Sequence, residues 1–549
     1  MTNVFHEISL LAVADRVTSF SPVHLSPLDY VVLAAYGLAI AGMSYAVSRR
    51  QKTTEDYFIA GRAMPGWAVA MTLMATLISS GTIVGHPATV YQKGLILLLG
   101  SLTLPLVLLG VARWIVPFYR HTVGMSAYEY IGARFGLGGR FYSSLGFIAD
   151  RIFDLGVTLL TTAIPITIMT GWRLESVILW TGAFTILYTM IGGIEAVVWT
   201  SVVQGGIFIG GAILIAARLV FAPEAGAPGA VVSAAWEAGR FSLGSFELSW
   251  RSLFDTTQTT QWLFILAYIT NWGRRYVADQ HMVQRYLIAR SDREASQGAF
   301  WNAMLCVPIY VTFMFVGACL YGYYQRTGQT PPPLADDVVP YFVGQHMPAG
   351  IVGLILAAIL SASMSSISAD LNSLATVVNT DYLLHFRPKC PMGRQMFFSR
   401  AIVVVAGALA AAVALLMAPK SGASSVMERG VTVAAVLSGG TLGLFFLGFL
   451  TRRATRLGCY SGVAACLAFT AWGLLTSPGT RLLDLGFNFT LNPILIGLCG
   501  HLVLFGVGYA VSVLFGGWRP ENVDRLTFWG RSARAPTANV EAKPVRTAP

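Results

Sequence analysis

Long apolar segments recur along the whole chain, and they constrain its fold more than any other feature of the sequence. About 13 of them are long enough to cross the roughly 30 Å of hydrocarbon in a bilayer. Because lipid offers no partner to backbone N–H and C=O groups, a segment of this length spans a bilayer as a helix. The sequence therefore predicts an all-α polytopic membrane protein with spans at 29–48, 66–91, 95–118, 141–170, 176–192, 197–220, 258–277, 299–323, 348–379, 396–417, 430–450, 459–476 and 490–516.

The composition supports a membrane protein and excludes most soluble classes. Charged residues make up 11% of the 549 residues, whereas soluble domains carry about 25%. The formal net charge of +11 does not indicate nucleic-acid binding, because the basic residues lie in short loops between apolar segments. Those loops are alternately rich and poor in Lys and Arg, which predicts an N-terminus outside and a C-terminus in the cytoplasm, in the plasma or inner membrane. We expect one transmembrane domain over 1–516 and a disordered cytoplasmic tail over 517–549.

Small polar side chains line one face of the predicted span 348–379. Ser361, Ser365, Ser368 and Asn372 recur at i, i+4, i+7 and i+11, so they share a helix face. Two interpretations are open. Such serines can donate back to the preceding turn or permit close helix packing. They can also offer neutral oxygen ligands to a small cation.

The second span, 66–91, carries small and helix-breaking residues at mid-depth, in the run Ser79–Thr82 followed by Gly85 and Pro87. A weaker break is expected at Thr270–Gly273 in the seventh span. Each of these spans opens a block of five, and an odd number of crossings gives the two blocks opposite orientations. Interrupted helices in corresponding positions of inverted halves predict a secondary transporter with its site near the midplane.

Four stretches resemble the sodium:solute symporter family, which includes sodium-coupled sugar, proline, pantothenate, monocarboxylate and sialic acid carriers. They are DYFIAGRAMPGW (56–67), GGIEAVVWTSVVQ (192–204), DQHMVQRYLIARS (279–291) and the serine-rich helix through Asn372 and Ser373. The resemblance implies the leucine-transporter type of fold, a 5+5 inverted repeat formed by spans 2–6 and 7–11. It also implies a symporter, not an enzyme, that works by alternating access with sodium as coupling ion and no other cofactor.

The resemblance further implies a sodium site between the first broken helix and the ninth span. Its ligands would be the backbone carbonyls of Ala75, Ile78 and Ala362 and the hydroxyls of Ser365 and Ser366. Neutral oxygens of this kind suit sodium, a hard cation.

A second sodium site exists in some family members, where it uses the Asp of a T-D-x-x-Q motif. This chain has Ser201 in place of that Asp, and Ala369 where a further hydroxyl is expected. We therefore expect the second site to be missing or weak, and one sodium ion to move with each substrate molecule.

Three features bear on the substrate. Ser79, Ser80 and Thr82 lie where the N-terminus of a half-helix favours an anion. Arg151, inside the fourth span, is a candidate partner for a substrate carboxylate, and in the sialic acid branch of the family an Arg near this point has that role. The alternative is a structural ion pair between Arg151 and its sequence neighbours Asp150 or Asp154.

The third feature is an absence on the first broken helix. Sugar carriers of the family have Asn, Glu and Gln side chains there, where this chain has Leu77, Gly81 and Thr82. With Trp272 as a further candidate contact, the pattern favours a small organic acid or an acidic sugar over a hexose. The alternatives are a carrier of a neutral sugar or amino acid, and a transporter-like membrane sensor. The expected partners are sodium, the solute and the lipid bilayer, with the monomer as the functional unit.

Overall fold

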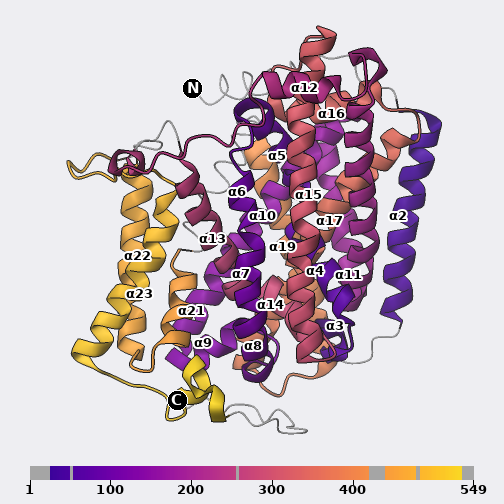
Figure 1. Ribbon diagram of the computed structural model, residues 1–549. Helices are drawn as coiled ribbons and strands as arrows, with labels where there is room; N and C mark the ends of the chain where they lie inside the picture. Colours follow the sequence, from indigo (N-terminus) through magenta and orange to yellow (C-terminus); the bar gives the residue numbers. More distant parts are fainter. Residues whose placement is uncertain (1–24, 50–53, 255–258, 419–438, 478–482, 534–549) are drawn as a thin grey trace, which may run out of the picture.

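The computed structural model describes residues 25–49, 54–254, 259–418, 439–477 and 483–533, and in these residues it is a bundle of helices (Figure 1). The main helices, with their bounds, are α2 (Pro27–Ser48), α3 (Thr54–Ile59), α4 (Gly66–Leu77), α5 (Ser80–Lys93), α6 (Leu98–Leu102), α7 (Leu104–Gly110), α8 (Val116–Thr122), α9 (Ala127–Phe135), α10 (Leu137–Thr170), α11 (Leu174–Val220), α12 (Ala230–Glu237), α13 (Gln261–Ala278), α14 (Gln280–Leu287), α15 (Asp292–Thr327), α16 (Ala335–His346), α17 (Ile351–Val377), α19 (Met392–Met417), α21 (Thr441–Leu450), α22 (Arg456–Thr476) and α23 (Leu495–Phe515).

Each predicted span has a helical counterpart. Among the described residues, nine helices are long and apolar enough to cross a membrane, and the bent pair α4–α5 makes ten. α11 has 47 residues, but Gly193 (φ 57°, ψ −166°) leaves the helical path and divides it into the fifth and sixth predicted spans. α13 matches the seventh span, and α21 matches the described end of the eleventh, of which 430–438 lie outside the described residues.

The predicted interruption of the second span is confirmed. α4 ends at Leu77, and Ile78 (ψ 123°) and Ser79 (ψ 179°) are extended. α5 then begins at Ser80, with its axis turned by 58°. The chain therefore leaves the helical path for two residues inside the bundle.

The predicted break at Thr270–Gly273 is wrong. α13 is helical through these residues, and the chain breaks at Asp279 (ψ 124°), between α13 and α14. A single glycine costs a helix only about 1 kcal/mol, which packing readily offsets. The break falls instead where the carboxylate of Asp279 pairs with Arg274, at 3.2 Å.

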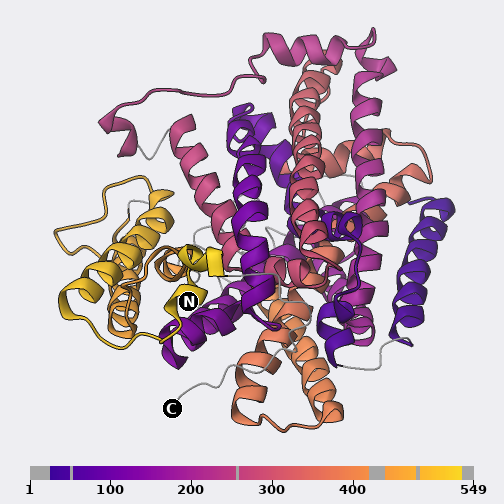
Figure 2. The same cartoon turned by 60° about the horizontal axis from the view of Figure 1, so that its bottom comes forward.

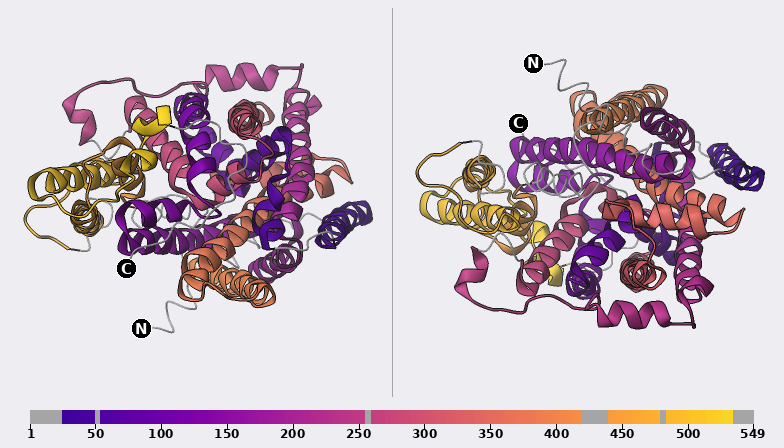
Figure 3. Two further views of the ribbon diagram at one scale, coloured as in Figure 1. Left: turned by 90° about the horizontal axis from the view of Figure 1, so that it is seen from below. Right: turned by 90° about the horizontal axis from the view of Figure 1, so that it is seen from above.

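The broken helix α4–α5 lies inside the bundle, where α4 packs against α11, α15 and α17, and α5 packs against α10, α15 and α16. Figures 2 and 3 show α2 at one edge of the molecule and the α22–α23 pair at the opposite edge. The interrupted helix is therefore enclosed by protein, as its unpaired backbone groups require in a membrane.

Part of the segment expected to be a disordered tail, 517–533, lies within the described residues. Two 3₁₀ turns, Val523–Leu526 and Phe528–Ala533, follow α23. The ring of Phe528 stacks on Phe449 of α21 at 5.0 Å and meets Phe118 of α8 edge-on at 5.3 Å. These few apolar side chains order a segment whose average composition is polar, and residues 534–549 lie outside the described residues.

Candidate functional site

The end of α4 presents free carbonyl oxygens in the middle of the bundle. A helix leaves its last carbonyls without helical partners, and here only the Met74 carbonyl receives the N–H of Ile78, the residue that follows the helix. Ser365 Oγ, on α17, donates to the Ala75 carbonyl at 2.8 Å. The serine-rich face of α17 therefore meets the broken end of α4.

Ser366 lies among more acceptors than it can satisfy. Its Oγ lies 3.0 Å from the Ile78 carbonyl, 3.1 Å from that of Thr76, 3.2 Å from that of Ala362 and 3.4 Å from that of Ala75. A hydroxyl has one hydrogen to donate, and Ser366 is only 7% exposed. The result is a buried surplus of carbonyl oxygens, which a cation would neutralise.

All five predicted sodium ligands are brought together at this point: Ala75, Ile78, Ala362, Ser365 and Ser366. Their role as ligands stays a prediction. The Thr76 carbonyl belongs to the same group and was missed from the sequence, although it lies in the same freed last turn of α4. The hydrogen bonds also agree with the packing interpretation of the serines, so the surplus of carbonyls is what favours the ion.

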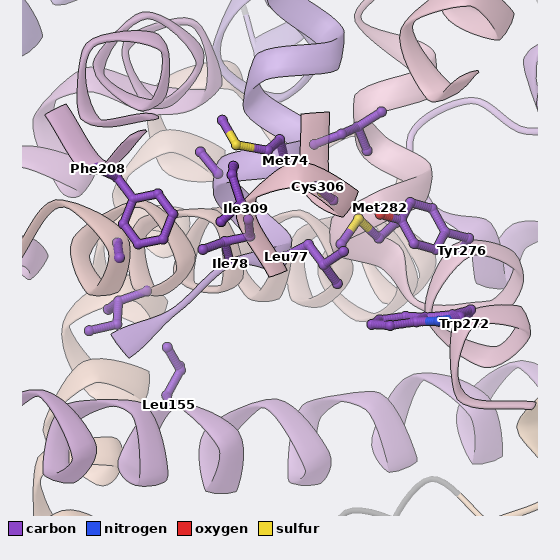
Figure 4. Close-up of a cluster of buried hydrophobic side chains, with 14 of the residues drawn as sticks. Met74, Leu77, Ile78, Leu155, Phe208, Trp272, Tyr276, Met282, Cys306 and Ile309 are labelled. Atoms are coloured by element: carbon purple, nitrogen blue, oxygen red, sulfur yellow. The ribbon is translucent and has the colours of Figure 1, made fainter. Parts of the chain in front are cut away.

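Apolar side chains of the broken helix and of α10, α11, α13, α14 and α15 form a buried cluster at the break (Figure 4). All of these side chains are at most 7% exposed, so little water reaches the carbonyl oxygens at the end of α4. Electrostatic interactions are stronger in such a low-dielectric site. The labelled members of the cluster are Met74, Leu77 and Ile78 of α4 and the break, Leu155 of α10, Phe208 of α11, Trp272 and Tyr276 of α13, Met282 of α14, and Cys306 and Ile309 of α15.

Hydroxyl groups fix the first turn of α5. Ser80 Oγ lies 3.0 Å from the hydroxyls of both Thr161 and Thr162 on α10, and Thr162 Oγ1 donates to Ser363 Oγ of α17. Ser80 therefore has a structural role whatever else it contacts. Ser79 is half-buried and Thr82 is buried on the same turn.

Trp272 carries an unused donor close to the break. Its ring lies 5.6 Å from that of Tyr268 and 6.2 Å from that of Tyr310, and Tyr310 stacks on His86 of α5 at 5.1 Å. Trp272 Nε1 is buried and has no hydrogen-bond partner among the described residues. An unpaired buried donor costs about 1–3 kcal/mol, so this N–H is available to a ligand.

Arg151 lies in a buried group of carboxylates. Its guanidinium is 2.6 Å from Asp150, 2.9 Å from Asp154, 3.7 Å from Asp370 and 4.0 Å from Asp279. The ion pairs with Asp150 and Asp154 were anticipated from the sequence. The ion pairs with Asp279 and Asp370 were missed, because these residues are far from Arg151 in the sequence and only helix packing brings them close to it.

Arg274 completes this charge network, defined here as Asp150, Arg151, Asp154, Arg274, Asp279 and Asp370. Arg274 lies 3.3 Å from Asp150 and 3.2 Å from Asp279. The network joins α10, the α13–α14 break and α17. Asp370 is one helical turn after Ser366 on α17. Through Asp370, the charge network lies next to the carbonyl oxygens at the end of α4.

The region where some family members have a second sodium site carries Ser201 in place of the carboxylate. Ser201 Oγ is buried without a hydrogen-bond partner among the described residues. Ser368 Oγ donates to the Ser365 carbonyl at 3.1 Å. The fully buried side chain of Ala369 has no oxygen to offer.

Comparisons with known proteins find relatives that match most of the chain. The model of the sodium:solute symporter family matches residues 57–465. The chain is 31% identical over 495 residues to a sodium/sialic acid symporter, NanT, of Aliivibrio fischeri, covering 89% of this chain and 93% of the relative. It is 30% identical over 456 residues to the sodium-coupled monocarboxylate transporter 1 of Mus musculus, covering 81% of this chain and 72% of the relative.

A solved structure described as the substrate-bound outward-open state of a sodium-coupled sialic acid symporter has the same fold. It matches with a TM-score of 0.80 at 28% identity, covering 89% of this chain and 98% of the other. The expected fold, an all-α membrane protein with the leucine-transporter type of inverted repeat, is thereby confirmed.

Proposed function

Because this chain belongs to the sodium:solute symporter family, we propose that it imports a small carboxylate-bearing solute together with one sodium ion, by alternating access. Sodium-coupled solute symport follows from the family, and the chain is a transporter, not an enzyme. The substrate class, the stoichiometry, the monomer as functional unit and the orientation with the C-terminus in the cytoplasm are the proposed parts.

The surplus of carbonyl oxygens around Ser366 Oγ is the main observation that supports the proposed sodium site. The carbonyl oxygens of Ala75, Thr76, Ile78 and Ala362 each lie within hydrogen-bond distance of the hydroxyl of Ser365 or Ser366. Carbonyls at a break in a transmembrane helix are ligands that transporters of this type use for sodium. Because none of these oxygens is charged, release of the ion leaves no buried net charge in the empty carrier.

A carboxylate on the substrate agrees with two features. Sialic acids and monocarboxylates, the solutes in the names of the two relatives, share this group. α5 begins at the break with no side-chain hydrogen bond from its N-cap residue, Ser79, and the N-terminus of a helix favours an anion. Trp272 Nε1 would supply one further donor. Arg151 is a weaker candidate for direct contact, because four carboxylates already surround its charge.

The substrate class can be tested with a thermal-shift screen of organic acids, acidic sugars, neutral sugars and amino acids, each with and without sodium. A ligand that binds only the folded protein raises its melting temperature. We expect a carboxylate to do so in sodium and to have little effect when potassium replaces it. Stabilisation by a neutral sugar or amino acid alone would refute the carboxylate, and binding without transport in proteoliposomes would favour the sensor alternative.

The stoichiometry gives a separate prediction. One sodium ion driven by 100 mV gains about 2.3 kcal/mol, but a monoanion carried with it moves no net charge. We therefore expect uptake in proteoliposomes with a Hill coefficient for sodium near one and no response to membrane potential. The double substitution S201D/A369S should raise the coefficient, whereas the neutral control S201N/A369S should not. A coefficient near two in the unmodified chain, with matching charge movement, would contradict the loss of the second site.

A further inference from the structure

A cavity of about 310 Å³ lies away from the broken helices, where the end of α21 meets α23 and the ordered part of the tail. In Figure 1 these elements form the edge of the molecule on the side of α22 and α23. The polar wall contains Arg452 and Arg453, and the apolar wall contains Phe505, Tyr509 and Trp529. None of these residues belongs to the proposed sodium or substrate site.

The polar wall is held in place by hydrogen bonds. Arg134 of α9 is fully buried and donates to the carbonyls of Thr451, at 2.9 Å, and Ala454, at 3.0 Å. Thr451 and Ala454 flank Arg452 and Arg453 in the α21–α22 connection, so the two hydrogen bonds hold the backbone on both sides of these arginines. Trp529 Nε1 donates to the Leu450 carbonyl at 2.7 Å and so fixes the tail beside the cavity. The cavity is therefore a built feature and does not depend on a loose loop.

The charge in the cavity is positive. Arg452 pairs with the exposed carboxylate of Asp524 at 3.0 Å. Arg453 is exposed and has no ion pair among the described residues. An anion with more than one oxygen could reach Arg453 directly and share Arg452 with Asp524.

The apolar wall continues along the outer face of α23. Leu502, Tyr509 and Val513 follow one another at i, i+7 and i+11, and they are 61%, 38% and 45% exposed. On a transmembrane helix such a face contacts lipid chains. The ring of Phe505 stacks on that of Tyr509 at 6.3 Å. Arginine and aromatic side chains at a helix end mark the interface between bilayer and water.

We propose that this cavity binds an anionic phospholipid of the cytoplasmic leaflet. The phosphate would contact Arg453 and Arg452, and the upper part of the lipid would lie against Tyr509 and Phe505. The α21–α22 connection belongs to the Lys/Arg-rich loops that the sequence places in the cytoplasm, and basic pockets between helices on that side bind acidic headgroups. The lipid-facing stripe that enters the cavity favours a phospholipid over a soluble phosphate.

The test uses the full chain in a neutral detergent, with phosphatidylglycerol or phosphatidylcholine of the same acyl chains added and bound lipid counted by native mass spectrometry. We expect phosphatidylglycerol to bind more tightly, and its affinity to fall about fivefold for each arginine removed in R453Q and R452Q/R453Q. R453Q breaks no ion pair, so it should fold normally. The matched control is R394Q, which removes an exposed arginine from the first turn of α19, in another Lys/Arg-rich loop.

Three results would overturn the proposal. The first is equal binding of the two lipids. The second is an equal loss of affinity in R394Q, which would mean that surface charge alone attracts the lipid. The third is competition by glycerol phosphate as effective as that by phosphatidylglycerol, which would identify a site for a soluble anion. Retained binding in R394Q together with the loss in R453Q would support the cavity.

Discussion

Replacing Ser366 with alanine is expected to raise the sodium concentration for half-maximal uptake about 10- to 100-fold. The estimate follows from the removal of one of the neutral oxygens that would contact the charged ion, since hydrogen bonds and contacts to charged groups are worth about 1.5–3 kcal/mol and 1.4 kcal/mol is tenfold. The hydroxyl lies among four carbonyls and water is largely excluded, so no solvent oxygen replaces it easily. Sodium-dependent uptake in proteoliposomes and the sodium-induced shift in melting temperature both report the change.

Ser373→Ala provides the matched control for this substitution. Ser373 lies on the same helix, is fully buried and donates to the Asp370 carbonyl at 2.8 Å. S373A therefore also removes a buried hydroxyl. Among the described residues, the Ser373 hydroxyl makes no hydrogen bond to a carbonyl at the end of α4. S373A should keep the sodium dependence of the unmodified chain, and S366T, which keeps a hydroxyl, should recover part of what S366A loses. If S366A and S373A change sodium dependence equally, the serines of α17 serve packing and the ion site lies elsewhere.

The first broken helix could be predicted because its cause is local. Ser79–Thr82 combines small and hydroxyl residues inside an apolar span, and the two extended residues fall at its edge. The second break could not be located, because nothing in the composition around Asp279 distinguishes it from a helix end in a loop. What marks it in the structure is a pair of ionic contacts, with Arg274 of the preceding helix α13 and with Arg151 of α10.

The same distinction applies to the site. The break predicts free carbonyls near Ala75 and Ile78, and the helical spacing predicts a face of hydroxyls that includes Ser365. The family resemblance then named these residues, with Ser366, as candidate sodium ligands. Whether an ion-pair partner of Arg151 could be predicted depends on its distance from Arg151 in the sequence. Asp150 and Asp154 lie on its own helix, whereas Asp370 reaches it only because α17 packs on α10. Side chains that meet through packing leave no periodic signal in the sequence.

Replacing Arg151 with glutamine is expected to abolish uptake and to lower the free energy of unfolding by about 3–5 kcal/mol, the usual cost of removing one partner from a buried ion pair. Among the described residues, the substitution leaves Arg274 as the one guanidinium within 4 Å of any of the four carboxylates of the charge network. The yield of monodisperse protein and the melting temperature without substrate measure this effect. R173Q is the control, because Arg173 is exposed and its 3.9 Å ion pair with Glu175 is worth about 1 kcal/mol or less.

Two further variants separate the interpretations of Arg151. If its main role is to neutralise the charge network, R151Q/D370N removes one charge of each sign and should regain part of the stability that R151Q loses, without regaining transport. If Arg151 instead binds the substrate carboxylate, R151K should keep the stability and the sodium-induced shift but lose the shift induced by substrate, because lysine keeps the charge and not the two-pronged geometry. We expect the first pattern, since Asp150 and Asp154 already accept hydrogen bonds from the guanidinium and two further carboxylates lie within 4.0 Å of it. A stable R151Q protein that binds sodium normally and fails only to bind substrate would assign Arg151 to the substrate site.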